Sequence, residues 1–306
     1  MIREFTEMGN ILAFDLGGTS VNYALVNDHG NMTNKGSIAT PDHLEDLLNF
    51  IHQQVEKFQD VKIEGIAISS PGSVSEKGII YGGSAIPYIH GPNIKALVKE
   101  ATGLEVEIEN DANCVALAEI WQGSAVGKKN VATVVLGTGI GGALIKDGVI
   151  HKGHHLHGGE FGYMIIDSRR IGSGMSTFSE VASTFSILKR VAYEKNIHVS
   201  ELTGEKIFLQ AEHGDEICKR AIEEFYQMLA IGIYNIQYIY DPEIILIGGG
   251  ISSRDDLIEH IQKEVQKLIQ QIDVAKVIPS IDRCYFRADA NLIGVAYHFI
   301  QQQKKR

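Results

Sequence analysis

A turn containing glycine and threonine lies between two apolar runs at two places in the 306-residue chain. The first copy is residues 11–28, ILAFDLGGTSVNYALVND, and the second is residues 130–147, NVATVVLGTGIGGALIKD. One offset, 137 − 18 = 119, relates Gly18 to Gly137 and Thr19 to Thr138. Each copy predicts a strand, a tight loop and a returning strand. Because glycine lets backbone N–H groups come close to an anion, both loops are candidate phosphate-binding sites.

The separation between the copies is much longer than the period of a solenoid repeat. It predicts instead two similar domains that face each other, each with one phosphate loop. We expect an N-terminal α/β domain made of residues 1–112 and a C-terminal helix, 290–306. The larger C-terminal α/β domain is expected to span residues 113–289.

Composition narrows the class of protein. A hydrophobic content of 44% with 22% charged residues is typical of a globular protein, and the net charge of −10 argues against binding to nucleic acid or anionic membranes. The three cysteines, Cys114, Cys218 and Cys284, are too scattered for a disulfide framework or a CxxC zinc pair. The N-terminus does not resemble a signal peptide, and no apolar run approaches the roughly 20 residues of a membrane span. We therefore expect a cytoplasmic protein.

A carboxylate stands at the end of the first apolar run. Asp15 directly precedes Leu16-Gly17-Gly18-Thr19. It could be a ligand to Mg²⁺, directly or through water, or it could cap the turn. The neighbouring duplicated loop favours the magnesium interpretation.

A polar cluster separates a predicted strand, 104–108, from a predicted helix, 114–121. It reads Glu109-Asn110-Asp111-Ala112-Asn113. Asn110 or Asp111 could cap the helix. Alternatively, the two side chains could bind the hydroxyls of a sugar, with an ionised Asp111 accepting a hydroxyl proton. The spacing of the residues leaves both interpretations open.

Three other stretches carry candidate ligand-binding residues. Ser70-Pro71-Gly72 follows a predicted strand, and Gly248-Gly249-Gly250 follows another, where a flat adenosine could lie against the backbone or a bare turn could form. His154, His155 and His157 could suggest a metal site, but their spacing lacks a matching ligand set, so solvated or sugar-contacting histidines are favoured.

The remaining periodicity indicates alternating strands and helices, which predicts an α/β protein with a ligand cleft. Two phosphate loops, a nucleoside loop and hydroxyl-binding side chains suit transfer of the γ-phosphoryl group of ATP to a sugar. A GxxxxGK[ST] motif is missing, so a P-loop kinase is excluded. The predicted helices are 42–58, 94–101, 114–121, 176–196, 214–240, 254–269 and 290–301, and further strands are 63–69, 104–108 and 243–247.

Six motifs together resemble the ROK (repressor, open reading frame, kinase) sugar kinases, from about Ile11 to the final helix. They are DLGGT at 15–19, SPG at 70–72, ENDANC at 109–114, LGTGIGG at 136–142, GGEFGY at 158–163 and LIGGGIS at 246–252. The resemblance implies a duplicated actin-like, ribonuclease-H-like ATPase fold of two domains with a central cleft. It also implies a homodimer that uses ATP and Mg²⁺.

The resemblance also implies residue roles. Asp111 would be the catalytic base that deprotonates the 6-hydroxyl of the sugar. Asn110 and Glu160 would hold sugar hydroxyls, Glu180 would reach the anomeric end, and Gly72 would line the pocket. Asp15, Gly17, Gly18 and Thr19 would handle magnesium and the transferring phosphate, Gly137, Thr138 and Gly139 the other phosphates, and Gly249 and Gly250 the adenosine.

One departure from the family pattern concerns the substrate. Tyr163 stands where many members have a sugar-contacting histidine, and the segment before Glu180, SRRIGSGMSTFS, lacks the cysteines of the CxCGxxGCxE zinc cluster. Structural zinc is therefore not expected. Tyr163 could stack on a sugar, donate a hydrogen bond, or fill the space of the missing zinc lobe. The sugar stays open among glucose, β-glucosides and N-acetylmannosamine.

Two alternatives belong to other classes of function. A sugar-sensing repressor of the same family would need a helix-turn-helix segment before Ile11, and both the ten residues there and the acidic charge argue against it. The other alternative is a sugar-binding protein without kinase activity. The presence of Asp111 and of both phosphate loops argues against that alternative.

Overall fold

The computed structural model describes residues 9–306 and divides them into two compact units. Unit 1 is the described part of Met1–Val126 with Lys152–His157 and Ala288–Arg306. Unit 2 is Gly127–His151 with Gly158–Arg287. The predicted domain boundaries at residues 112 and 290 stay predictions.

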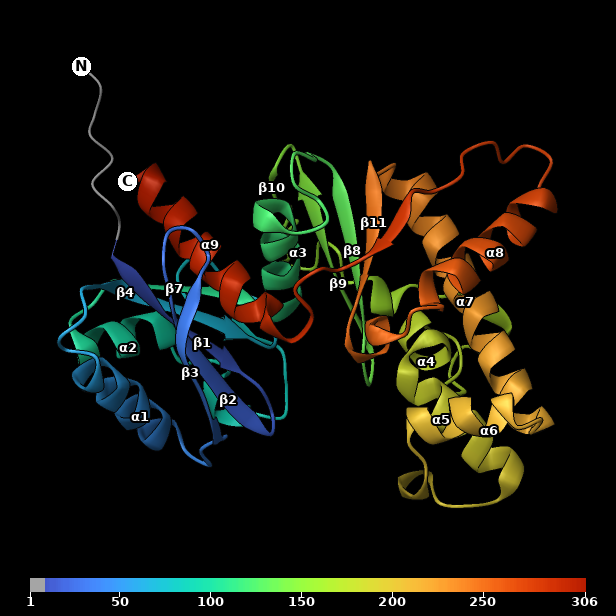
Figure 1. The fold of residues 1–306 in the computed structure, drawn as a ribbon, viewed down its shortest axis with the longest axis horizontal. Helices are drawn as coiled ribbons and strands as arrows, with labels where there is room; N and C mark the ends of the chain where they lie inside the picture. The colour runs from blue at the N-terminus through green and yellow to red at the C-terminus, as the bar shows by residue number, and fades with distance from the viewer. Residues whose placement is uncertain (1–8) are drawn as a thin grey trace. The chain divides into compact units, whose positions relative to one another are not determined.

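Unit 1 contains a five-stranded sheet of order β3-β2-β1-β4-β7 (Figure 1). β2 is antiparallel to β1 and β3, whereas β4 is parallel to β1 and β7 is parallel to β4. The strands are β1 (Asn10–Leu16), β2 (Ser20–Val26), β3 (Met32–Ala39), β4 (Ile63–Ser70) and β7 (Val106–Asn110), and a small hairpin of β5 (Ser73–Val74) and β6 (Ile80–Tyr81) follows β4.

The apolar run of β1 is buried on both faces of this sheet because alternate side chains point to opposite sides. Leu12 and Phe14 belong to a cluster with helices α1 (Leu44–Lys57) and α2 (Ile94–Thr102). Ile11 and Ala13 belong to a second cluster with helices α3 (Asp111–Gln122) and α9 (Ala290–Lys305).

Helices α3 (Asp111–Gln122) and α9 (Ala290–Lys305) pack closely together, and α9, red in Figure 1, lies against β1 and β4. The approach requires glycine at Gly294, where an added Cβ would lie 1.7 Å from the carbonyl oxygen of Cys114. The final segment of the chain therefore completes the unit that contains its first strand.

Unit 2 repeats this sheet, in the order β10-β9-β8-β11-β12 with the same strand directions. Ala13 pairs with Ala24 in unit 1, and Thr133 pairs with Ala143 in unit 2. The offset of 119 thus relates the returning strands, whereas the first strands differ by 133 − 13 = 120, because the first loop is one residue longer. The strands are β8 (Val131–Leu136), β9 (Ile140–Lys146), β10 (Val149–Ile150), β11 (Ile244–Gly248) and β12 (Ile281–Arg283).

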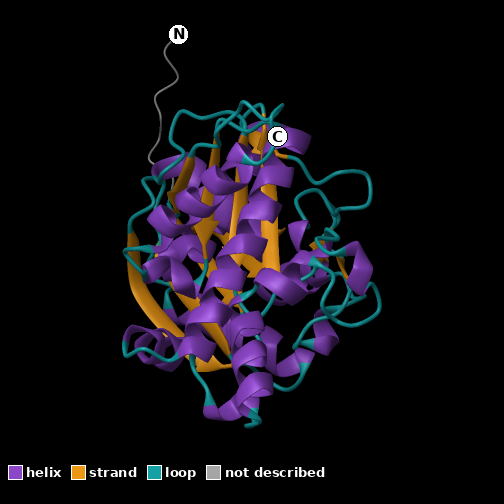
Figure 2. Ribbon diagram, turned by 90° about the vertical axis from the view of Figure 1, so that its right-hand side faces the viewer, coloured by secondary structure: helices purple, strands orange, loops and turns teal. Residues whose placement is uncertain are grey.

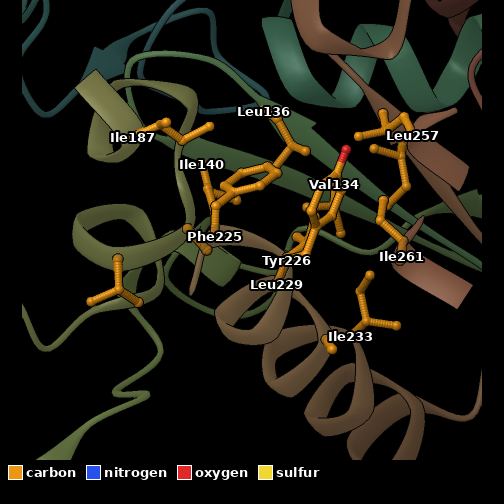
Figure 3. Packing of buried hydrophobic residues seen from close by; sticks show 14 of the residues in the cluster. Val134, Leu136, Ile140, Ile187, Phe225, Tyr226, Leu229, Ile233, Leu257 and Ile261 are labelled. Atoms are coloured by element: carbon orange, nitrogen blue, oxygen red, sulfur yellow. The ribbon is translucent and has the colours of Figure 1, made fainter. Parts of the chain in front are cut away.

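Helices α7 (Glu216–Tyr240) and α8 (Leu257–Gln270) cover one face of the sheet in unit 2 (Figure 2). Phe225, Leu229 and Ile233 of α7 are fully buried in one cluster with Val134 and Leu136 of β8 (Figure 3). The predicted helix 214–240 is confirmed as α7. Its apolar residues recur with a period near 3.6 residues and form the face that packs on this sheet.

The predicted helix 176–196 is wrong in one respect, since it forms two helices, α4 (Phe178–Ala182) and α5 (Thr184–Lys195). Ser183 between them is extended and its hydroxyl caps α5 by accepting a hydrogen bond from Ser186 N at 3.2 Å. Helix α6 (Gly204–Glu212) and strand β3 were not predicted. Among residues 9–306, no helix is long and apolar enough to cross a membrane.

Short 3₁₀ helices complete the described chain. They are η1 (Pro87–Ile89), η2 (Phe161–Tyr163), η3 (Ser168–Arg170), η4 (Val199–Glu201), η5 (Gly250–Ser253) and η6 (Arg287–Asp289).

Candidate active site

Asp111 is the first residue of α3, directly after strand β7. Its Oδ1 accepts hydrogen bonds from Ala112 N at 2.8 Å and from Asn110 Nδ2 at 2.9 Å. The N-terminus of α3 also favours the ionised carboxylate through the helix dipole. The carboxylate is therefore held in one orientation, and its predicted role as the catalytic base stays a prediction.

Asn110 caps α3, which confirms the helix-cap interpretation of this residue. Its Oδ1 accepts a hydrogen bond from Asn113 N at 3.0 Å. Its Nδ2 donates to Asp111 and, at 3.0 Å, to the carbonyl oxygen of Gly72. The cap residue thus ties the candidate base to the SPG turn, and its predicted contact with sugar hydroxyls stays a prediction.

Gly72 adopts the left-handed region, with φ of +95°. A Cβ there would lie 2.8 Å from the carbonyl oxygen of Tyr81 and 3.1 Å from Cε1 of His90. Only glycine fits this turn without strain, and the turn brings the Gly72 carbonyl to Asn110.

A buried ion pair lies beneath the turn that carries Asp111. The side chain of Glu109 is only 1% exposed, and its Oε2 lies 2.8 Å from Lys152 Nζ. Its Oε1 accepts hydrogen bonds from Asn110 N at 2.8 Å and Asn113 Nδ2 at 3.0 Å. Burial lowers the pKa of His298, whose Nδ1 is 3.6 Å from Glu109, so Lys152 provides the positive charge at neutral pH.

Asp15 ends β1 beside the first glycine loop. Its Oδ1 accepts hydrogen bonds from Ser69 Oγ and from Asn291 Nδ2, each at 2.9 Å. Burial raises the pKa of Asp15, although these hydrogen bonds and one from Asn22 act in the opposite direction. A cation beside this carboxylate would offset the cost of burying its charge, and carboxylate oxygen is a ligand that Mg²⁺ prefers. The residue therefore fits the predicted magnesium role.

The first glycine of each loop donates a backbone hydrogen bond that closes the turn, although the first loop is one residue longer. Gly17 N donates to Ser20 O at 3.0 Å, and Gly137 N donates to Gly139 O at 2.9 Å. Gly17, and not Gly18 as the offset of 119 predicted, is therefore the counterpart of Gly137. In each loop the next two residues are exposed: Gly18 and Thr19 in one, Thr138 and Gly139 in the other. Exposed N–H groups in a tight turn suit the binding of phosphate oxygens.

Unit 2 carries the GGEFGY segment. Gly159 has φ of +91°, and a Cβ there would lie 2.7 Å from Ala143 Cα, so the segment packs directly on β9. Glu160 precedes the 3₁₀ helix η2, in which Phe161 is buried and Tyr163 is 72% exposed. A ring with that exposure does not fill a packing void, so of the three predicted roles for Tyr163 the filler role is the one that the structure argues against.

Glu180 is fixed at the start of α4. Its Oε2 accepts hydrogen bonds from Ser176 N at 2.9 Å and Thr177 N at 2.8 Å, and the Thr177 hydroxyl accepts one from Glu180 N. These backbone hydrogen bonds lower the pKa of Glu180, so it is ionised near neutral pH. Its predicted contact with the anomeric end of a sugar stays a prediction.

The third glycine loop follows β11. Gly249 has φ of +91°, and a Cβ there would lie 2.0 Å from the carbonyl oxygen of Leu136. A Cβ on Gly250 would meet nothing within 4 Å. Gly249 thus packs directly on the end of β8, whereas Gly250 is exposed, and the predicted contact of these glycines with adenosine stays a prediction.

The three clustered histidines do not form a metal site. Among the described residues 9–306, no group of three or more His, Cys, Asp or Glu side chains could hold a metal ion. The rings of His154 and His155 lie 4.6 Å apart, and His157 Nδ1 lies 2.7 Å from the carbonyl oxygen of His155. The predicted absence of structural zinc stays a prediction.

Sequence reasoning missed the residues that support these candidates. Ser69 is a buried polar residue at the end of an apolar strand, and that position could have revealed it. Lys152 and Asn291 carry no local signal, because each contacts its partner only after the chain has folded.

Two sheets of equal strand order, each with a glycine loop between its first two strands, define a duplicated α/β protein. The model of the ROK family matches residues 11–302, and the chain belongs to this family. Its fold is accordingly the actin-like, ribonuclease-H-like ATPase fold that the sequence predicted.

Three relatives are similar over nearly their whole length. A beta-glucoside kinase of Listeria monocytogenes is 34% identical, with 96% of this chain and 99% of the relative covered. A solved ROK family protein from Streptococcus pneumoniae, in complex with sucrose, is 38% identical, with a TM-score of 0.90 and coverage of 97% and 100%. A solved putative N-acetylmannosamine kinase from Listeria monocytogenes is 33% identical, with a TM-score of 0.86 and coverage of 96% and 99%.

Proposed function

We propose that the protein is a sugar kinase that transfers the γ-phosphoryl group of Mg-ATP to the 6-hydroxyl of a hexose. The observation that carries this proposal is the carboxylate of Asp111, which is oriented by two hydrogen bonds at the start of α3. A hydroxyl is a weak nucleophile until a positioned base takes its proton, and this carboxylate is such a base. The family membership points to the same chemistry.

On the acceptor side, Asp111 takes the proton as the sugar oxygen attacks phosphorus. Asn110, Glu160 and Glu180 hold the hydroxyls, and Tyr163 offers an exposed ring to a sugar face. Gly72 lines the sugar pocket, as the family resemblance implies. A larger residue at this position would displace the turn that Asn110 holds.

On the donor side, phosphoryl transfer depends mainly on positioning and on neutralising spread negative charge. Mg²⁺ supplies much of that neutralisation when it is bound, and Asp15 is the residue that would hold it. The loop of Gly17, Gly18 and Thr19 receives the transferring phosphate through the N–H groups of its two exposed residues, because Gly17 N–H is used within the loop. The loop of Gly137, Thr138 and Gly139 binds the other phosphates, and Gly249 and Gly250 border the adenosine.

The favoured acceptor is glucose or a β-glucoside, because a relative 34% identical over nearly the whole chain is named a beta-glucoside kinase. N-acetylmannosamine is the alternative, from the name of a structural relative. We further propose a cytoplasmic homodimer, as the family resemblance implies.

The test is a coupled assay of the purified protein with Mg-ATP and a panel of sugars. The panel contains glucose, cellobiose, N-acetylmannosamine, N-acetylglucosamine, fructose and mannose. At least one sugar should be phosphorylated. Sugar binding without turnover would favour the sugar-sensing alternative instead.

Asp111→Asn should lower kcat by roughly 10²-fold or more while sugar binding survives, because the amide cannot accept the proton. Asp147→Asn makes the same chemical change at an exposed turn residue and should leave kcat unchanged. Near-normal turnover of Asp111→Asn would remove Asp111 from its assigned role.

A further inference from the structure

A threonine from outside each phosphate loop holds the first glycine of that loop. Thr40, after the end of β3, donates its hydroxyl to the carbonyl oxygen of Gly17 at 2.5 Å. Thr184, the first residue of α5, donates its hydroxyl to the carbonyl oxygen of Gly137 at the same distance. Each contact lies within one unit. Although the two threonines come from different kinds of element, the hydrogen bond that they make is the same.

Backbone hydrogen bonds reinforce both contacts. Thr40 N donates to the carbonyl oxygen of Thr19 at 3.1 Å, and Thr184 N donates to the carbonyl oxygen of Gly137 at 3.1 Å. Both threonines are partly buried, so water competes only weakly for these carbonyl oxygens. The carbonyl oxygen of each first glycine is therefore held toward its threonine.

Fixing this carbonyl also fixes the next N–H group. In a trans peptide, C=O of one residue and N–H of the following residue point in opposite directions. A held Gly17 carbonyl thus directs Gly18 N–H away from Thr40, and a held Gly137 carbonyl directs Thr138 N–H away from Thr184. Gly18 and Thr138 are both exposed.

Glycine makes this restraint necessary. A peptide bond that begins at glycine can rotate into conformations that other residues rarely adopt. Such a rotation would turn the carbonyl oxygen toward the ligand side of the loop, where it would repel a phosphate oxygen. A hydrogen bond to the carbonyl disfavours that rotation without placing a side chain in the ligand's path.

We propose that Thr40 and Thr184 are positioning residues for phosphate binding, each aiming a loop N–H group at a phosphate of ATP. This inference rests on the proposed function, because it takes the two loops as phosphate sites. Since the Gly17 loop serves the transferring phosphate, loss of the Thr40 hydroxyl should mainly lower kcat. Since the Gly137 loop serves the other phosphates, loss of the Thr184 hydroxyl should mainly raise KM for ATP.

Thr→Val removes the donor and keeps the shape of the side chain. We expect Thr184→Val to raise KM for ATP by about 3- to 10-fold, the range of one hydrogen bond, with KM for the sugar changed by less than about twofold. Thr40→Val should lower kcat by a similar factor. Thr40→Ser and Thr184→Ser keep the hydroxyl and should stay near the wild-type values.

Two other threonines provide matched controls. Thr102 donates its hydroxyl to the carbonyl oxygen of Val98 at 2.7 Å, so Thr102→Val removes the same kind of bond at the end of α2. Thr133 is fully buried, and within the described chain its hydroxyl has no hydrogen-bond partner. Neither Thr102→Val nor Thr133→Val should change KM for ATP or kcat by more than about twofold.

Calorimetric binding of Mg-ADP and of adenosine separates a positioning role from a merely structural one. A positioning role weakens Mg-ADP binding in Thr184→Val and leaves adenosine binding unchanged, whereas general loosening of the fold weakens both. If valine is not tolerated, Thr184→Ala removes the same hydroxyl and gives the same comparison. Equal weakening of both ligands, or serine variants as impaired as the valine variants, would overturn the inference.

The result also distinguishes this inference from the proposed function. A wild-type protein that binds Mg-ADP but phosphorylates no sugar would overturn the kinase proposal, and the Mg-ADP comparison would still decide the role of Thr184. An active wild type with a fully active Thr40→Val and Thr184→Val pair would overturn the inference alone. A wild type that binds no Mg-ADP would overturn both.

Discussion

Replacing Lys152 with methionine would leave the buried carboxylate of Glu109 without its ion-pair partner. Methionine keeps a similar unbranched stem but removes the charge 2.8 Å from Glu109 and the hydrogen bond to the carbonyl oxygen of Val74. In the wild-type protein burial lowers the pKa of His298, so this neighbour of Glu109 is mostly neutral at pH 7 and Lys152 is the main counter-charge. Breaking a buried pair costs about 3–5 kcal/mol, and since the Lys152 side chain is 22% exposed we expect about 3 kcal/mol.

The single tryptophan of the chain provides the assay. Trp121 lies in α3 of unit 1 and stacks on Tyr297 with ring centroids 4.9 Å apart. Its fluorescence therefore reports unfolding of the unit that contains Glu109 and Lys152. For a unit of this size, a loss of about 3 kcal/mol should lower the unfolding temperature by about 6–12 °C.

A second lysine–glutamate pair in unit 1 is the control. Lys99 pairs with Glu105 at the surface, where the side chains are 54% and 38% exposed, so Lys99→Met should cost no more than about 1 kcal/mol. Adding Glu109→Gln to Lys152→Met removes the buried charge and should recover part of the lost stability. The reasoning is refuted if Lys152→Met costs no more than Lys99→Met, or if the double variant is less stable than Lys152→Met alone.

Two further substitutions test Asp15 and Gly249. Because burial raises the pKa of Asp15, the folded protein binds the Asp15 proton more tightly than the unfolded chain does. This difference contributes stability that is fully present below pH 3.8, the usual pKa of the group, and is lost as pH rises through the pKa in the folded protein. Asp15→Asn should therefore raise the unfolding temperature of the ligand-free protein at pH 7, by less as pH falls toward 4, while abolishing turnover; an unchanged or lower value at pH 7 would contradict this. Gly249→Ala forces a Cβ to within 2.0 Å of the carbonyl oxygen of Leu136 at a positive φ, so it should cost about 1–3 kcal/mol in thermal unfolding and raise KM for ATP. Gly204→Ala, where a Cβ meets nothing within 4 Å, should cost almost nothing, and equal effects of the two changes would count against the predicted strain.

Elements with a strong local pattern were predictable. The apolar runs of β1, β4 and β8 and the long periodic helix α7 lie where the sequence placed them, because burial selects such patterns directly. Strand β3 was missed because most of its side chains are exposed, so its sequence lacks an apolar pattern. Its extended conformation is stabilised by the backbone hydrogen bonds to β2. The break at Ser183 was missed because the apolar periodicity continues past this residue, although the backbone of Ser183 is extended and ends the helical conformation.

The types and spacing of residues were sufficient to identify the duplication, the two glycine loops and the polar turn at Asn110–Asp111, since each is a short stretch whose chemistry depends on its own residues. The partners that hold these stretches were decided by the tertiary structure alone. Asn291 donates to Asp15 across 276 positions of sequence, and Thr184 reaches Gly137 across 47. Such contacts leave no local pattern, because a single hydroxyl or amide becomes a partner only when packing brings its element within hydrogen-bond distance.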